Sequence, residues 1–182
     1  FLITAAVGTI YYDDLVLESF KGNVAIRDQS LGLNDITFNM LEGSLAMDGL
    51  YESKNLKSPG FYFDLDVKNL DIKQTYDKFI AVQKLAPVAE QCKGRYSAAF
   101  DVKGNMDSKM EPVINSFTGS GKLSTNEVTV ENFKPLVELA DVLKMDQFKK
   151  MDLKNLNLSF KFENGRVNID PFDINVEGIK TT

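Results

Sequence analysis

Strict alternation of apolar and polar residues is the feature that most constrains this fold. The clearest case is residues 156–170, with the sequence LNLSFKFENGRVNID. If Asn164-Gly165 forms a two-residue turn, every apolar residue of this segment falls on one face and every polar residue on the other. The predicted cross-strand pairs are Phe162 with Val167, Phe160 with Ile169 and Lys161 with Asn168. This pattern is typical of a half-buried antiparallel sheet.

Other segments repeat the alternation and predict a mostly β protein. Residues 60–68 form the cleanest strand, with Phe61, Phe63, Leu65 and Val67 on one side. Further strands are expected around residues 24–26, 31–33, 36–40, 96–102, 123–130 and 172–176. Turns are expected at Asp13-Asp14, at residues 28–30, at Asn34-Asp35 and at Glu42-Gly43. The last of these turns would pair Met40 with Leu45 and Phe38 with Met47.

Two segments show a helical period instead. Asp71 and Gln74 have the spacing of a capping box, and an apolar stripe follows that Pro87 ends or kinks. A second helix is expected to open at Pro135 and to stop near Lys149-Lys150. The fold class is therefore α+β, mostly β: a long, curled, groove-like antiparallel sheet with two amphipathic helices packed on it.

Composition and charge exclude several classes of protein. The 182 residues are 43% apolar, enough for one domain spanning residues 1–182. A net charge of −5 argues against nucleic acid and against an electrostatically bound anionic membrane. The chain opens on Phe1-Leu2-Ile3 and not on Met. We therefore expect a fragment of a longer protein, with any membrane anchor outside this segment.

No catalytic constellation emerges from the sequence. There is no histidine, the commonest general base and metal ligand. Residues 116–123 resemble a phosphate loop, but Leu123 follows Lys122 where a hydroxyl should hold magnesium. Asp64 and Asp66 lie on the same face of a strand, and we interpret them as ordinary solvent-exposed residues. Cys92 has no imidazole partner, and the sequence assigns it no role. We expect no enzyme, no cofactor and no metal site, with an oxygen-only metal hydrolase as a remote alternative.

The apolar surface of the predicted sheet exceeds what two helices cover. About ten strands at ~4.8 Å spacing and ~25 Å length give a face on the order of 1,200 Å². Two helices of ~12–15 residues cover about 400 Å² of it. The rest must be hidden by curling, by missing chain, by a partner or by an apolar ligand. The candidate lining of a lipid groove is Phe61, Phe63, Leu65, Val67, Tyr96, Phe100, Phe160 and Phe162, for which an ordinary core is the alternative reading.

Several of these motifs, taken in order, resemble the C-terminal region of AsmA-like proteins. They are Gly22-Asn23-Val24, the run from Leu31 to Phe38, Glu42 to Leu45, Asp48 to Tyr51, Phe117 to Thr125, Phe162 to Val167 and Pro171-Phe172. The resemblance, which extends to TamB-type envelope proteins, implies a periplasmic region of an inner-membrane-anchored protein in a Gram-negative bacterium. It further implies a curled sheet with an apolar groove, a role in outer-membrane biogenesis and phospholipid transport, and no catalytic residues.

Two functions follow as hypotheses. The first is a non-enzymatic lipid-binding or lipid-transfer module that holds the acyl chains of a phospholipid in an apolar groove. The second is a structural or assembly module that docks envelope proteins through its apolar face or its strand edges.

Overall fold

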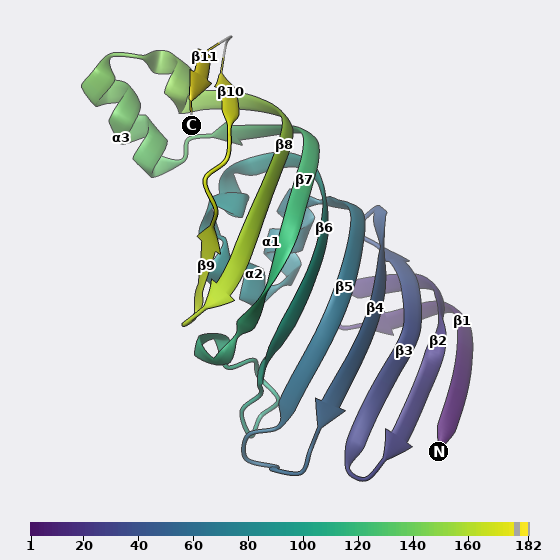
Figure 1. Cartoon of the computed structure of the whole chain (residues 1–182). Coiled ribbons are helices and arrows are strands. Elements are labelled where there is room, and N and C mark those ends of the chain that lie inside the picture. The colour runs from purple at the N-terminus through teal and green to yellow at the C-terminus, as the bar shows by residue number, and fades with distance from the viewer. Residues whose placement is uncertain (177–178, 182) are drawn as a thin grey trace.

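One large antiparallel sheet dominates the computed structural model, which describes residues 1–176 and 179–181 (Figure 1). Its strands follow one another in chain order: β1 (Leu2–Tyr12), β2 (Leu15–Arg27), β3 (Ser30–Met40), β4 (Gly43–Glu52), β5 (Gly60–Asp71), β6 (Cys92–Asn105), β7 (Thr118–Glu131), β8 (Lys150–Glu163) and β9 (Arg166–Ile169). Two short strands, β10 (Ile174–Val176) and β11 (Ile179–Thr181), pair with each other. The mostly β, antiparallel prediction is confirmed.

The predicted curl is wrong in degree, because the sheet is neither closed nor strongly curled (Figure 1). The prediction assumed that the apolar face had to be hidden by the sheet itself. Instead, the three connections between β5 and β8 carry helical turns that pack on this face, so the sheet keeps an open twist.

The register of the last hairpin is confirmed. Phe162 pairs with Val167, Phe160 with Ile169 and Lys161 with Asn168. The register predicted for β3 and β4 is wrong by two residues, because the turn consists of Leu41-Glu42, with φ angles of 46° and 62°. The observed pairs are Met40 with Gly43 and Phe38 with Leu45. A slip of two residues leaves every side chain on its predicted face.

The turn predicted at Asn34-Asp35 is a bulge inside β3. Asp35 has a left-handed φ of 54°, and the pairing with β4 shifts between Leu33 and Ile36. Asn69 in β5 does the same, with a φ of 57° and a shift between Val67 and Leu70. An extra residue at each bulge returns the next apolar side chain to the same face.

The helical elements lie in the long connections. They are α1 (Ile72–Lys78), α2 (Ile80–Leu85) and the 3₁₀ turn η1 (Pro87–Gln91) between β5 and β6, η2 (Ile114–Ser116) between β6 and β7, and α3 (Lys134–Leu143) with η3 (Asp146–Lys149) between β7 and β8. None of the helices in the described residues is long and apolar enough to span a membrane.

The predicted helix starts are confirmed, and so is the end at Pro87, because α2 ends at Leu85 and a 3₁₀ turn begins at that proline. The helices are broken earlier than the sequence predicts. The Asp71 carboxylate accepts a hydrogen bond from the Gln74 backbone N–H at 2.8 Å. The first helix is interrupted at Phe79, whose backbone is extended, before it reaches Pro87. The second ends at Leu143 because the next residue adopts a left-handed conformation.

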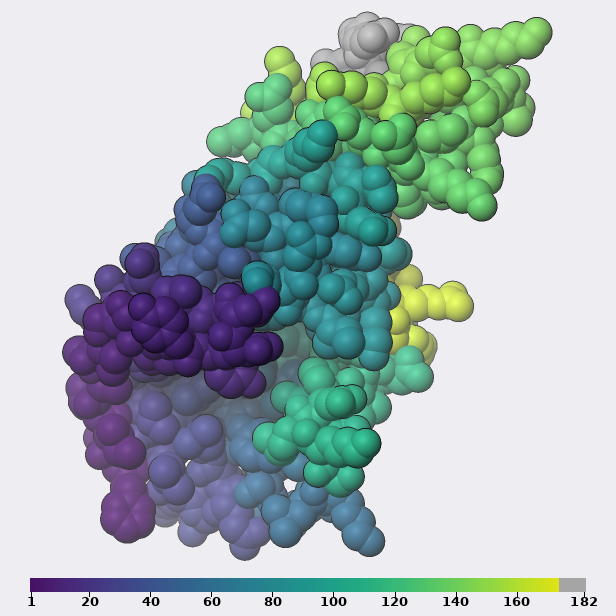
Figure 2. Space-filling model, turned by 180° about the vertical axis from the view of Figure 1, so that it is seen from behind, coloured from purple at the N-terminus to yellow at the C-terminus, as the bar shows by residue number. Residues whose placement is uncertain are grey.

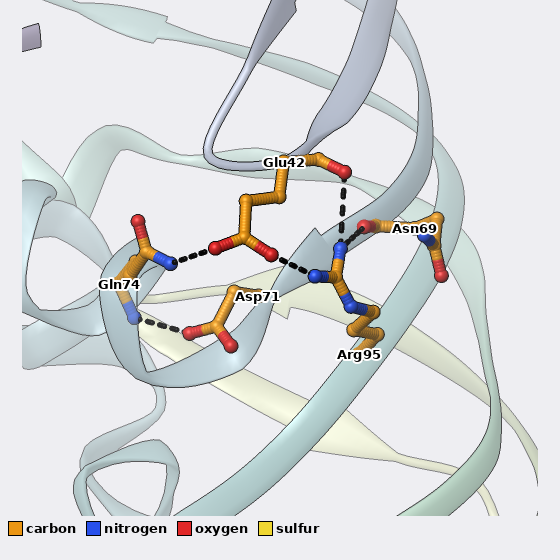
Figure 3. A network of polar contacts seen from close by, with 5 residues as sticks. All are labelled: Glu42, Asn69, Asp71, Gln74 and Arg95. Carbon is orange, nitrogen blue, oxygen red and sulfur yellow. Dashed lines mark hydrogen bonds and ion pairs between the residues drawn. The ribbon is translucent and has the colours of Figure 1, made fainter.

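A polar network fixes the start of α1 against the strands (Figure 3). The Arg95 guanidinium on β6 forms an ion pair with the Glu42 carboxylate and donates to the backbone oxygens of Glu42 at 3.0 Å and Asn69 at 3.2 Å. The side-chain amide of Gln74 donates to the same carboxylate at 3.4 Å. Three separate chain segments are thereby joined where the helices begin to cover the sheet.

Candidate apolar binding surface

A single row of apolar residues and glycines crosses the whole sheet on one face, here called the inner face. Each member pairs directly with the next across neighbouring strands. From β1 to β9 the row consists of Ile3, Val24, Leu33, Gly49, Phe63, Val102, Gly119, Phe162 and Val167. A parallel row from β3 to β9 consists of Ile36, Met47, Leu65, Phe100, Gly121, Phe160 and Ile169. The inner face is therefore apolar along its full width.

Phenylalanine side chains on this face lie against glycines of the next strand. A Cβ atom added to Gly49 would lie 2.4 Å from the Phe63 ring, and one added to Gly121 would lie 2.2 Å from the Cβ of Phe100. The missing side chains leave room for the aromatic groups to lie flat on the sheet. This packing makes the inner face flatter.

All eight residues predicted to line a groove point to the inner face, but they differ in burial. Phe61, Val67 and Phe160 are buried, with 7%, 3% and 8% of their surface exposed. The other five, Phe63, Leu65, Tyr96, Phe100 and Phe162, are half-buried. The three buried residues serve as core, which was the alternative reading of this set.

Most of the aromatic members form one continuous cluster. Ring centroids lie 5.4 Å apart for Phe61 and Phe63, and 5.9 Å apart for both Phe100–Phe160 and Phe100–Phe162. Phe117, from the connection after β6, joins the two groups at 5.4 Å from Phe61 and 6.4 Å from Phe162. Sequence reasoning did not include Phe117 in the surface, because it precedes the strand and so falls outside the alternating pattern.

Tyr96 lies apart from this aromatic cluster. It packs against the core group of Val67, Leu70 and Ala98 under the first helices. Burial raises the pKa of its hydroxyl, and a hydrogen bond with Thr75 acts in the opposite direction. Tyr96 is thus part of the covered core of the sheet.

The inner face is not covered along its whole width. Phe1, Ile3 and Val7 on the β1 side are 96%, 50% and 41% exposed, and Ile26 on β2 is 46% exposed. These four residues are here called the open flank. Sequence reasoning proposed none of the four for a site, because residues 1–7 (FLITAAV) are apolar on both faces and show no clear alternation.

Covering elements border the open flank on two sides. Figure 2 shows α1, α2 and η1 (teal) over the centre of the inner face and the connection of residues 106–117 (green) below these helices in the view. The inner face is recessed between these covering elements and the N-terminal strands (purple). The Tyr51 hydroxyl donates to the Met110 sulfur of that connection at 3.1 Å. Lys78 at the end of α1 forms an ion pair with Asp14 in the β1–β2 turn. The open flank therefore forms one side of a shallow trough.

The opposite face of the sheet is polar. A depression of about 600 Å³ on it spans β5 to β8, where Ser97, Ser124 and Ser159 present short side chains. Asp64 and Asp66 also lie on this face and are exposed, and Asp66 forms an ion pair with Lys68 at 3.2 Å. In the described part of the chain, no group of three or more Asp, Glu or Cys residues is placed to hold a metal ion.

The remaining chemical candidates have structural explanations. Residues 116–123 run from η2 into β7, so no helix follows the glycines as a phosphate loop requires. Cys92 is buried, its Sγ donates to the Val88 carbonyl at 3.3 Å, and burial raises the pKa of the thiol. A thiol held protonated in this way is a poor nucleophile.

Comparisons with protein-family models, with curated proteins and with solved structures found no match for this chain.

Proposed function

We propose that this chain is a non-enzymatic module that holds the acyl chains of a phospholipid, or of another acyl lipid, against the open flank of its inner face. The observation that carries the proposal is the apolar row across nine strands, whose exposure rises from 7% at Val102 to 50% at Ile3. An apolar surface that is continuous with the core but uncovered at one side is suited to an apolar ligand.

The proposed site is a shallow trough, and not the strongly curled groove that the sequence predicts. Its floor runs across strands from Ile3 to Phe63, about 19 Å at ~4.8 Å per strand. Each methylene group buried there contributes ~0.8 kcal/mol, so an extended acyl chain is held without any specific polar contact. The paired inner-face row contains no charged residue, which favours a ligand recognised by its hydrocarbon part.

The resemblance to AsmA-like proteins supports the setting of this proposal. On that basis we place the chain in the periplasm of a Gram-negative bacterium, as part of an inner-membrane-anchored protein that serves outer-membrane biogenesis by moving lipid. The alternative is an assembly module that docks envelope proteins, and an uncovered apolar face would serve that role as well.

Native mass spectrometry of gently purified protein tests the proposal directly. We expect bound species whose mass matches phospholipid, and we expect the protein to enhance the emission of a fluorescent fatty acid. Ile26→Glu, which places a charge on the open flank, should weaken binding of this probe at least about tenfold, because a buried carboxylate needs a partner that the inner-face row does not offer.

Leu50→Glu is the matched control. Leu50 is 38% exposed, close to the 46% of Ile26, but it pairs with Tyr62 on the polar face. Circular dichroism should show both variants folded, and Leu50→Glu should bind the probe like the unaltered chain. Lipid-free protein that fails to bind the probe would overturn the proposal, and equal losses in the two variants would place any binding elsewhere.

A further inference from the structure

A third row of paired residues on the inner face leads from the open flank toward the centre of the sheet. Direct pairs from β2 to β6 join Ile26, Leu31, Tyr51, Phe61 and Gly104. The exposed fraction falls along this row, from 46% at Ile26 to 7% at Phe61, with Leu31 and Tyr51 half-buried between them. The trough is therefore open beside Ile26 and closed where the row reaches β6.

The ring of Phe117 closes the row at its β6 end. A Cβ atom added to Gly104 would lie 2.9 Å from the Phe117 ring and 3.0 Å from the Phe61 ring, so the two rings fill the space above this glycine. Their centroids are 5.4 Å apart and their planes meet at 81°. Phe117 thus stands across the end of the row and packs edge to face with Phe61.

The backbone before Phe117 is fastened to the end of β6. The Ser116 hydroxyl accepts a hydrogen bond from the Asn105 backbone N–H at 2.8 Å and donates one to the Val113 carbonyl at 2.6 Å. The Val113 N–H in turn donates to the Asn105 carbonyl at 2.9 Å. These bonds fix the position of the Phe117 ring relative to the sheet.

Two covering elements meet at the same point. Leu85 of α2 and Ile114 of η2 both pack against the buried group of Phe61, Val102 and Phe117. Phe117 itself is only 7% exposed. A hydrocarbon chain that follows the row from Ile26 therefore meets a packed wall at β6.

We propose that Phe117 is the end stop of the trough and limits the length of the acyl chain that the trough holds. This inference rests on the proposed lipid binding. The acyl chain lies along the row, with its terminal methyl group against Phe61 and Phe117 and its polar end toward Ile26. Each methylene group on the row gains from burial, whereas a packed wall accepts extra groups only with strain.

Saturated fatty acids of increasing length, each displacing the fluorescent fatty acid, measure this limit. Below the limit each added methylene group should strengthen binding about fourfold, and beyond it the gain should disappear. Phe117→Leu keeps an apolar side chain beside Phe61 but removes the ring, so the limit should move to a longer fatty acid. Phe133→Leu is the matched control, because Phe133 packs against the separate core group that includes Val128 and Met151 and should leave the limit unchanged.

Nitroxide-labelled fatty acids give a reading on the unaltered chain that does not depend on the folding of the variants. A nitroxide near the methyl end of the fatty acid should broaden the methyl NMR signals of Ile114 more than those of Ile26. A nitroxide beside the carboxyl group should broaden the signals of Ile26 more.

Several outcomes would overturn the end stop and leave the proposed lipid binding in place. They are affinity that keeps rising with length, an unchanged limit in Phe117→Leu, an equal shift of the limit in Phe133→Leu, and the reverse order of broadening in the NMR spectra. Failure of every fatty acid to bind would overturn the proposed function and the end stop together.

Discussion

The same row of the inner face is exposed at the β1 end and buried near its centre. Ile3 on β1 is 50% exposed, whereas Val102 on β6 is 7% exposed. The difference comes from the connections. The connections between β1 and β4 are tight turns such as Asp13-Asp14 and Leu41-Glu42, and they are too short to cover the sheet. The three connections between β5 and β8 carry helical elements that pack on the inner face. Alternation thus decides which face is apolar, and connection length decides where that face is covered.

The largest effect should come from removing a side chain under the helices. Leu70 is 1% exposed and packs with Val67 and Ala98, so Leu70→Ala should lower the free energy of unfolding by about 2–5 kcal/mol. Ile3→Ala shortens a residue of the open flank and should change it by less than about 1 kcal/mol. Urea denaturation followed by circular dichroism measures both values. Similar losses at the two positions would show that the open flank is buried in solution.

Much of the fold follows from the period of the sequence alone. The hairpin at Asn164-Gly165 was predictable to the exact pair, because its turn type has a strong sequence signature and fixes the register. The β3–β4 register was not, because a turn with two non-glycine residues of positive φ, Leu41 and Glu42, has no such signature. The sequence predicts a turn at Asn34-Asp35, where the structure has a bulge, because asparagine and aspartate are common in both.

The candidate site was predictable only in its chemistry. Alternation places Phe63 and Phe162 on one apolar face, as the structure has them. It does not reveal that Phe61 and Phe160 are buried by neighbours distant in sequence, or that Phe117 completes the aromatic cluster. Coverage depends on where three connections pack, and no periodic signal encodes that contact.

Glycine substitutions should change stability by a smaller amount. The change should have opposite signs on the covered strand β7 and on the edge strand β1. Gly121→Ala on β7 places a Cβ 2.2 Å from the Cβ of Phe100, and it should cost about 1–3 kcal/mol of stability. Gly8→Ala on β1 meets nothing within 4 Å and should raise stability by about 0.4–1 kcal/mol, because the unfolded chain loses freedom. Thermal unfolding of both variants gives the comparison. A loss at Gly8 as large as that at Gly121 would mean that another group packs on the face of β1 at Gly8 in solution.

The smallest effect concerns pH and should arise only under the covering elements. Burial raises the pKa of Cys92 above its ordinary value of 9.0, and burial likewise raises that of Tyr96 above 10.0. Both groups are neutral when protonated, and the folded state holds these protons more tightly than the unfolded state does. Their contribution to stability is therefore complete below about pH 9 and is lost as pH rises through the raised values.

Urea midpoints measured from pH 7 to about pH 10.5 should accordingly fall at the alkaline end. Cys92→Ala should flatten the part of this fall nearest pH 9, although it lowers the midpoint at every pH by opening space beside Val128 and Met151. Tyr96→Phe should flatten the part above pH 10. Parallel curves for the unaltered chain and both variants would show that water reaches these two groups, and that the centre of the inner face is as open as its flank.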